Sequence, residues 1–204
     1  MSATAFAPGS VTTVFVPQGG TSALGISFAT ADGVTATVDP ADETAVHLDG
    51  RPAEVAPVAG VLRRLDVSAH VHLDTDVPIG CGFGVSGAAT LATAFAANAE
   101  GQLGRERTEL VEASHQAEVA AGTGLGDVFI QNRGGVVWDV GEGLCHAERS
   151  ARIEYVSFGE ISTSEVLGDE GAMERVEAAG TKALAAIEPR SEEHTSELQS
   201  PSAI

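Results

Sequence analysis

The chain has 204 residues, 43% of them hydrophobic, and its 29 acidic against 11 basic residues give a net charge of −18. This hydrophobic fraction is enough for a real core and excludes disorder over the whole chain. Such strong acidity disfavours nucleic acids and anionic membranes as partners. Only one basic residue is a lysine, Lys182, a composition typical of proteins adapted to very high salt. A GC-rich genome, which replaces Lys by Arg, is the alternative explanation.

We expect neither export nor membrane insertion. The N-terminus lacks a basic region followed by a long apolar stretch, which a secretory signal needs. The longest apolar segment with a helical pattern, residues 88–97, is too short and too rich in threonine to span a bilayer. Cys81 and Cys145 form neither a disulfide framework nor a metal-binding pattern. Together these features predict a reduced, cytoplasmic protein.

The predicted elements mix strands and helices. Stretches rich in Val and Thr between Gly, Pro and Asp predict strands at residues 11–16, 23–28, 34–38 and 44–48. An amphipathic helix is expected at 54–65 and an alternating strand at 67–73. Further on, the pattern predicts helices at 85–98, 107–121 and 173–187, and strands at 128–131, 135–140 and 153–158. Because no βαβ unit repeats at a fixed period, an α+β fold is favoured over a doubly wound sheet.

The end of the chain differs from the rest. Residues 190–200 show no apolar periodicity and resemble the in-frame translation of a common sequencing-adapter oligonucleotide. A polar disordered tail is the alternative interpretation. We treat 190–204 as an artefactual tail and expect natural C-terminal sequence to be missing.

A glycine-rich segment at residues 78–87 is the first candidate site. Gly80, Gly82 and Gly84 alternate and let the backbone approach a ligand closely. The helix expected from Val85 offers unpaired N–H groups and a positive dipole end, which bind phosphate without a lysine. Ser86 lies in its first turn, where its hydroxyl can reach a metal or a phosphate oxygen. A Walker A loop or a protein-kinase site is excluded, because both need a lysine that this segment lacks.

Two other interpretations of this segment remain. Its Gly-x-Gly-x-x-Gly string, ending at Gly87, matches the dinucleotide-binding fingerprint, with Glu100 at a tolerable distance. That fingerprint belongs to a βαβ unit, however, and Glu100 ends the same helix. The segment can also be a glycine turn that only packs a helix closely.

The second candidate segment joins a helix to a second glycine turn. Glu118 falls at the border of the apolar stripe of the helix at 107–121, and His115 lies on the same flank. A half-buried carboxylate beside a cleft suits a magnesium ion. Asp127 follows the turn and leads into the strand expected at 128–131. Taken singly, these residues read equally as an edge glutamate, a surface histidine and a turn aspartate.

Together, the segments resemble GHMP kinases, the group of galactokinase, homoserine kinase and mevalonate kinase. Residues 78–88, Pro-x-Gly-x-Gly-x-Gly-x-Ser-Gly-Ala, are similar to the second motif of that family. Glu118 and residues 124–127, followed by a Gly-Gly pair, are similar to its magnesium glutamate and its Ser-Gly-x-Asp segment. The variant Gly-Leu-Gly-Asp is closer to archaeal pantoate kinases, as is the opening at 5–12, with Ser10 where His is common. The resemblance covers roughly residues 3–189.

The resemblance implies an α+β fold of the GHMP kinase N-terminal type, similar to domain 2 of ribosomal protein S5. That domain is expected at 1–159, followed by the start of a truncated C-terminal domain at 160–189. The implied activity is ATP-dependent phosphorylation of a hydroxyl of pantoate to 4-phosphopantoate, in coenzyme A biosynthesis. The family carries a further glycine-rich segment near its C-terminus that closes over the nucleotide. This chain lacks it, so we expect the fragment itself to be inactive.

The resemblance also implies a role for each site residue, with ATP and Mg²⁺ as cofactors. Ser86 and Glu118 would hold Mg²⁺, and Asp127 would orient or deprotonate the attacking hydroxyl; phosphoryl transfer needs mostly positioning and charge neutralisation. Ser22 and His115 match positions tied to pantoate recognition. The residues expected to wrap the ATP phosphates are Gly80, Gly82, Gly84, Val85, Ser86 and Gly87.

The acceptor is the open part of this interpretation. Arg133 is the nearest arginine that could bind a substrate carboxylate, and Trp138-Asp139 stand where pantoate kinases tend to carry a basic residue. The alternatives are a GHMP kinase for another small hydroxy acid or isoprenoid alcohol, of homoserine or mevalonate type, and a non-catalytic binding module. A nicotinamide-binding oxidoreductase is a third class. A homodimer is compatible with the resemblance, and the oligomeric state stays open.

Overall fold

Two long antiparallel strands, β1 (Ala3–Pro17) and β2 (Ala23–Pro40), form the centre of the sheet. The computed structural model describes residues 1–18, 23–124, 126–157, 159–160, 166 and 168–197, with side chains up to residue 187. Strand β1 pairs with one edge of β2 along its length. The register of this pairing shifts at two places, between residues 8 and 10 and between residues 12 and 14 of β1. Such irregularities bend a strand pair. They separate two halves of β2 that have different neighbours on the other edge.

Those neighbours are β5 (Ala69–Thr75), beside residues 34–40 of β2, and β6 (Val136–Asp139), beside residues 25–28. The sheet is completed by β3 (Ala45–Leu48), parallel to β5, and by the short strands β4 (Arg51–Pro52) and β7 (Cys145–Ala147). The order is β4-β3-β5-β2-β6-β7, with β1 off this path against β2.

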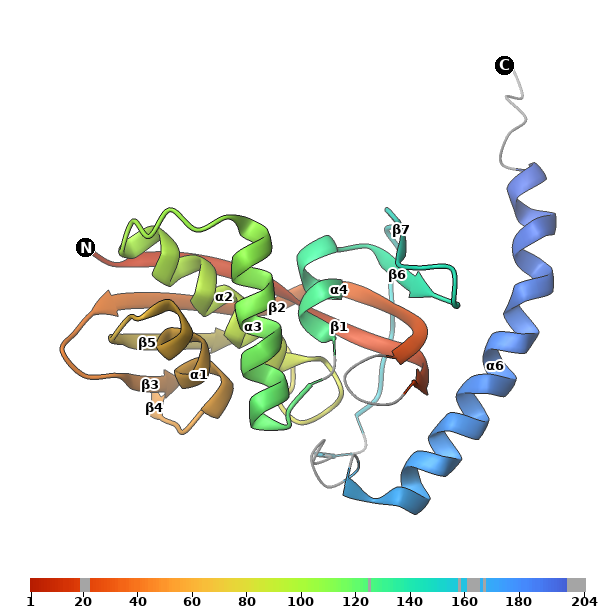
Figure 1. Ribbon diagram of the computed structural model, residues 1–204, viewed down its shortest axis with the longest axis horizontal. Helices are drawn as coiled ribbons and strands as arrows, with labels where there is room; N and C mark the ends of the chain where they lie inside the picture. Colours follow the sequence, from red (N-terminus) through yellow and green to blue (C-terminus); the bar gives the residue numbers. More distant parts are fainter. Residues whose placement is uncertain (19–22, 125, 158, 161–165, 167, 198–204) are drawn as a thin grey trace.

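Helices α1 (Ala56–Leu65), α2 (Val85–Glu100) and α3 (Arg107–Ala121) lie together over one face of the sheet (Figure 1). Side chains alternate along the strands, and Val34, Ala36 and Val38 of β2 are fully buried in the core beneath these helices. Most of α2 consists of Ala, Thr and Gly, which allows close contact with β1, β2, α1 and α3. The small side chains of α2 therefore bring its first turn close to the strands.

Two further helices complete the described structure. The short helix α4 (Asp127–Arg133) contacts α2, β1 and α3. The long helix α6 (Glu170–Glu197) contacts β1 through a second, smaller cluster formed by Val14, Val16 and Leu184. In Figure 1 it lies at the opposite side of the molecule from α1. Among the described residues, no helix combines the length and hydrophobicity that crossing a bilayer requires.

The α+β prediction is confirmed, and most predicted elements are present. The helices at 54–65, 85–98 and 107–121 correspond to α1, α2 and α3, and the strands at 67–73 and 135–140 correspond to β5 and β6. The strands predicted at 23–28 and 34–38 are parts of the single long strand β2. The helix predicted at 173–187 lies within α6, which begins three residues earlier and continues to residue 197.

Two predicted strands are wrong. Residues 128–131 were expected as a strand because Val, Phe and Ile favour strands, but they belong to α4, where Val128 and Gln131 are buried with helical spacing. The strand predicted at 153–158 is not formed by residues 153–157, which have no regular structure. There the Tyr155 ring packs edge-on against Phe83, with ring centres 4.7 Å apart. Residues 153–157 thus contact the glycine-rich segment through Tyr155 and do not pair with a strand.

The contact between α6 and β1 depends on Gly180. A Cβ atom there would lie 2.1 Å from the backbone oxygen of Phe15, which cannot move aside as a flexible side chain would. Gly180→Ala should therefore separate α6 from β1, although Ala favours helix formation by about 1 kcal/mol. Hydrogen exchange should show faster exchange in α6 and in residues 10–17.

Gly171→Ala is the matched control in the same helix. A Cβ atom there would meet only side-chain atoms, of Asp169 and Arg175, at 3.4 and 3.5 Å. This variant should keep α6 in place. Equal exchange rates in the two variants would contradict the assignment of Gly180 as the contact point.

Candidate active site

The glycine-rich segment forms a turn whose shape requires glycine. Gly80, Gly82 and Gly84 have φ of 71°, 82° and 61°, in the left-handed region that residues with a side chain disfavour. Gly84 is the N-cap of α2, which begins at Val85 as predicted, and no side chain caps it. The first amides of a helix have no partner within the helix. The uncapped first turn of α2 therefore offers N–H groups to an anion.

Three side chains from two elements, Ser10 on β1 and Asp127 and Gln131 on α4, meet at Gly84. The Gln131 amide on α4 donates to the Gly84 carbonyl (2.7 Å) and to the Ser10 hydroxyl (3.2 Å). Ser10, on β1, donates its hydroxyl to Oδ1 of Asp127 (3.4 Å) and its backbone N–H to the carbonyl of Phe83 (2.9 Å). A Cβ atom on Gly84 would lie 2.3 Å from the Ser10 hydroxyl. The absence of a side chain at Gly84 therefore leaves room for the hydrogen bonds among Ser10, Gln131 and Asp127.

Glu118 forms a second polar group beside the same turn. Its Oε1 accepts hydrogen bonds from Ser86 (2.9 Å) and Thr90 (2.8 Å), and its Oε2 accepts one from Thr123 (3.0 Å). The carboxylate is buried, with 2% of the residue exposed, and not half-buried as expected from the helical wheel. A Cβ atom on Gly124 would lie 3.0 Å from Oε2 of Glu118 and 3.8 Å from Oδ2 of Asp127. The two carboxylates therefore face the same glycine.

A cavity of about 510 Å³ opens beside Asp127. Strands β1, β2 and β6 and helix α4 supply its walls. Its polar lining includes Asp127, Thr12, Ser27 and Asp139. Its apolar lining includes Val14, Leu24, Ile130, Val137, Trp138 and Leu144. Asp127 thus belongs both to the glycine turn and to a mainly apolar cavity large enough for a small organic molecule.

The part of the chain that contains the turn and the two carboxylates matches a known family model. The family model described as "GHMP kinases N terminal domain" matches residues 54–135, which include the glycine turn, Glu118 and Asp127. This part of the chain is therefore similar to a GHMP kinase N-terminal domain. A pantoate kinase from the archaeon Methanospirillum hungatei is 30% identical over 148 residues, 66% of this chain and 51% of that protein. The chain therefore spans about half the length of the curated relative that it matches.

Solved structures show the same fold. A phosphotransferase related to the CoA biosynthesis pathway superposes with a TM-score of 0.72 at 24% identity, over 92% of this chain and 69% of that one. A homoserine kinase from Cytophaga hutchinsonii gives 0.53 at 23% identity, over 71% and 51%. A mevalonate kinase from Staphylococcus aureus gives 0.53 at 16%, over 70% and 54%. These likenesses establish the GHMP kinase fold.

The structure brings together some of the predicted site residues. Ser86, Glu118 and Asp127 converge on the glycine turn at the start of α2, from three different helices. His115 is linked to the cavity through Phe129. The two rings pack with their centres 4.8 Å apart, and Phe129 lines the cavity. The Nδ1 atom of His115 is buried without a hydrogen-bond partner among the described residues.

The other two residues predicted to bind the acceptor are Arg133 and Ser22. Arg133 is exposed at the C-terminal end of α4, six residues or about 9 Å along the helix from Asp127, and it is not among the residues that line the cavity. Because 127–133 is a helix, Arg133 lies away from the glycine turn. Ser22 lies outside the described residues.

Sequence reasoning did not assign a role to four residues of the candidate site: Ser10, Thr90, Thr123 and Gln131. Gln131 follows Asp127 by four positions, so a helical interpretation of 127–133 would have placed both on one face. Thr90 likewise follows Ser86 by one helical turn. Nothing local to Ser10 indicates its contact, because its partners are more than 100 residues away.

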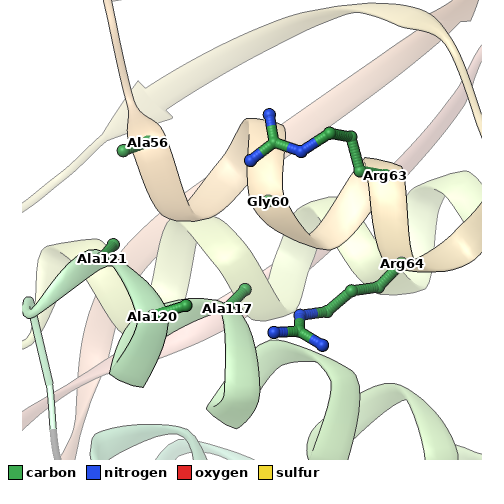
Figure 2. A pocket seen from close by; sticks show the side chains of 7 residues that line it. All are labelled: Ala56, Gly60, Arg63, Arg64, Ala117, Ala120 and Ala121. Carbon is green, nitrogen blue, oxygen red and sulfur yellow. The ribbon is translucent and has the colours of Figure 1, made fainter.

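A second cavity, of about 270 Å³, lies between α1 and α3, away from these groups (Figure 2). Alanine and glycine form most of its lining, and Arg63 and Arg64 extend along it. Arg64 donates to the side chain of Gln116 (3.0 Å) and to its backbone carbonyl (3.2 Å). Both arginines lie in the last turn of α1, where positive charge stabilises a helix. Arg64 thus connects α1 to α3, and the lining formed by described residues holds no carboxylate or hydroxyl.

Burial changes the acidity of both site carboxyls. Burial raises the pKa of Glu118, against hydrogen bonds from Thr90, Ser86 and Thr123 that lower it, and the charge of Asp127 adds to the rise. Burial also raises the pKa of Asp127, against the hydrogen bond from Ser10. Desolvation disfavours the charged form of an acid. A positive charge at this position would therefore favour ionisation of both groups.

These raised pKa values predict a dependence of stability on pH. A raised pKa means that the folded chain holds these protons more tightly than the unfolded chain, so this stabilisation is lost as pH rises. The difference in unfolding free energy between the wild type and Glu118→Gln/Asp127→Asn should become more favourable to the wild type as pH falls from 7 towards the ordinary values of 4.5 and 3.8. Urea titrations in a chelator, at several pH values, measure it.

A control pair separates this effect from general acidity. Asp42 and Glu43 are exposed between β2 and β3, so Asp42→Asn/Glu43→Gln should leave the pH dependence of the wild type nearly unchanged. A site variant that follows the wild type in parallel at every pH would show that the two site carboxyls have ordinary acidity.

Proposed function

We propose that the chain is the nucleotide-binding part of an ATP-dependent kinase that phosphorylates a hydroxyl of pantoate, giving 4-phosphopantoate. One observation carries this proposal: Asp127 faces both the glycine turn at the start of α2 and the 510 Å³ cavity. A hydroxyl bound in the cavity next to Asp127 would lie close to a phosphate bound at the turn. Phosphoryl transfer requires this juxtaposition of acceptor and donor.

The phosphates of ATP would bind at the turn formed by residues 80–87. Positive φ at Gly80, Gly82 and Gly84 exposes backbone N–H groups, and the uncapped start of α2 adds its own. Such a site attracts anions without a lysine side chain. This route suits a chain with a net charge of −18 and one lysine.

A magnesium ion fits the oxygen donors beside this turn. Ser86 and Glu118 would hold it, since their oxygens are 2.9 Å apart and Glu118 has only hydroxyl partners. Magnesium prefers oxygen ligands and usually takes one or two carboxylates together with water and substrate phosphates. The described residues contain no cluster of three acidic, His or Cys side chains, so the protein alone does not enclose the ion. When bound, it would supply positive charge to the phosphates.

Asp127 would receive the proton of the attacking hydroxyl. The hydroxyl oxygen forms a bond to the γ-phosphorus, the bond to ADP breaks, and the proton passes to the carboxylate. The raised pKa of Asp127 makes it a stronger base than an ordinary aspartate. Ser10 holds Oδ1 of Asp127, and Gln131 holds Ser10, so the carboxylate has a fixed direction.

Two observations favour pantoate as the acceptor. The curated relative is a pantoate kinase, and aliphatic side chains such as Val14, Leu24 and Val137 line the cavity. They match the two methyl groups on one carbon of pantoate. Homoserine, which has a charged end and no branch, would leave these walls without contact. Fold likeness to homoserine and mevalonate kinases keeps an acceptor of their types as the second candidate.

The proposal extends to the arrangement of domains. Residues 1–159 would form the nucleotide-binding domain, and residues 160–189 would begin a second domain, with 190–204 outside both. The match to half of a curated relative supports a longer protein. Turnover would require the remainder of that second domain.

Asp127→Asn tests the catalytic role. In the full-length protein, with pantoate, ATP and Mg²⁺, we expect the variant to lower kcat by at least about 10²-fold, because loss of a general base has that order of effect. The readout is coupled ADP release, with the fold checked by circular dichroism. Asp32→Asn, at an exposed position of β2, should keep full activity.

Other outcomes would change the proposal. Good turnover of homoserine or mevalonate without turnover of pantoate would replace the acceptor. If the wild type releases no ADP with any of the three acceptors, the chain is a binding module and the kinase proposal is wrong.

A further inference from the structure

We propose that Asp139 determines acceptor specificity: its carboxylate binds a second hydroxyl of the acceptor within the cavity beside Asp127. The inference rests on the proposed function, because it assigns the cavity to the acceptor. It concerns a residue that stands outside the glycine turn and outside the Glu118 group. Its three supports are the position of Asp139 in the cavity lining, the hydrogen bonds of its carboxylate and the charge of that lining.

Asp139 reaches the cavity from the end of β6. It pairs in register with Gly25 of β2, and both residues line the cavity. A Cβ atom on Gly25 would lie 2.1 Å from the backbone oxygen of Val14, so β1 and β2 approach closely there. Asp139 and Asp127 thus reach one cavity from different elements, β6 and α4.

The turn after β6 fixes the carboxylate of Asp139. Its Oδ1 accepts the backbone N–H of Gly141 (2.8 Å) and of Gly143 (3.3 Å). Both glycines have φ near 100°, where other residues would be strained. Within the described part of the chain, Oδ2 of Asp139 has no hydrogen-bond donor. One oxygen therefore holds the turn, and the other is free to accept a hydrogen bond from a ligand.

The charge of the lining selects what that oxygen binds. Among the described residues, those that line the cavity include two carboxylates, Asp127 and Asp139, and no Lys, Arg or His. An acceptor carboxylate placed among them would be repelled, whereas hydroxyl groups can donate to both. An acceptor with two hydroxyls would give one to Asp127 and the other to Asp139. Its own carboxylate would then point to the mouth of the cavity.

This arrangement matches a dihydroxy acid with a branched carbon between its hydroxyls. One hydroxyl would be the phosphorylated group at Asp127, and the hydroxyl next to the acid carbon would be bound by Asp139. The aliphatic wall formed by Val14, Leu24 and Val137 would contact the branch. A hydrogen bond to an ionised group corresponds to about tenfold to hundredfold in affinity.

Asp139→Asn isolates this role. The asparagine oxygen still accepts from Gly141 and Gly143, so the turn is kept, while an NH₂ group replaces the free oxygen. The binding partners are pantoate and 4-hydroxy-3,3-dimethylbutanoate, which lacks the 2-hydroxyl, each titrated by calorimetry into the 204-residue chain. Asp32→Asn is the matched control, because Asp32 is exposed and is not part of the cavity lining.

The wild type and Asp32→Asn should bind pantoate at least about tenfold more tightly than the analogue. Asp139→Asn should lower this preference, because a hydrogen bond to a neutral amide is weaker than one to a carboxylate. In the full-length protein the same variant should raise KM for pantoate at nearly constant kcat. Asp127→Asn, in contrast, should lower kcat.

The outcomes separate this inference from the proposed function. If the wild type binds pantoate but Asp139→Asn keeps its preference over the analogue, Asp139 only forms the turn and the inference is wrong. Equal losses for both compounds also contradict it, because they indicate a general change in the cavity. If the wild type binds neither compound and the full-length protein releases no ADP with pantoate, the assignment of the cavity to this acceptor is wrong, and the proposed role of Asp139 is wrong as well.

Discussion

The site depends on the contact of Gln131 and Ser10 with Gly84. A single amide group connects α4 to the turn that begins α2 and to a hydroxyl on β1. Only a residue without a side chain leaves room for it, since a Cβ atom on Gly84 would overlap both neighbours. Asp127 begins α4, so the same contact sets the direction of its carboxylate. The first turn of α2, the base and the cavity therefore have fixed positions relative to one another.

This contact also explains how so acidic a chain can hold phosphate. Long cationic side chains are scarce, and the binding groups are instead backbone amides held in place by glycines and by the burial of α2. Two carboxyls with raised pKa, Glu118 and Asp127, lie beside those amides. Each is costly to ionise alone, and a divalent cation between them and the phosphates would offset that cost. Under the proposed function, the negative charge of the site would thus be part of its affinity for a metal-bound nucleotide.

Much of this could be predicted from the sequence, because the signals were local. The alternating glycines and the small residues after Val85 predicted a turn and a helix, and the spacing of Glu118 in α3 placed it towards the site. The failures arose where distant contacts decided the outcome. Residues 128–131 favour a strand by composition, but burial of Val128 and Gln131 against the rest of the fold makes them helical. Glu118 is fully buried only because hydroxyls from α2 and from the turn after α3 satisfy its oxygens.

The close fit of α6 against β1 has a consequence for the cavity on the same strand. Gly180 rests on the backbone of Phe15, and Leu184 packs with Val14; Val14 and Phe15 also line the cavity beside Asp127. The strand is thus a shared wall between the C-terminal helix and the space for the acceptor. Any shift of that helix would widen or narrow the space without disturbing the glycines that face the nucleotide. Under the proposed function, acceptor affinity and nucleotide affinity would therefore change independently, through residues that touch neither ligand.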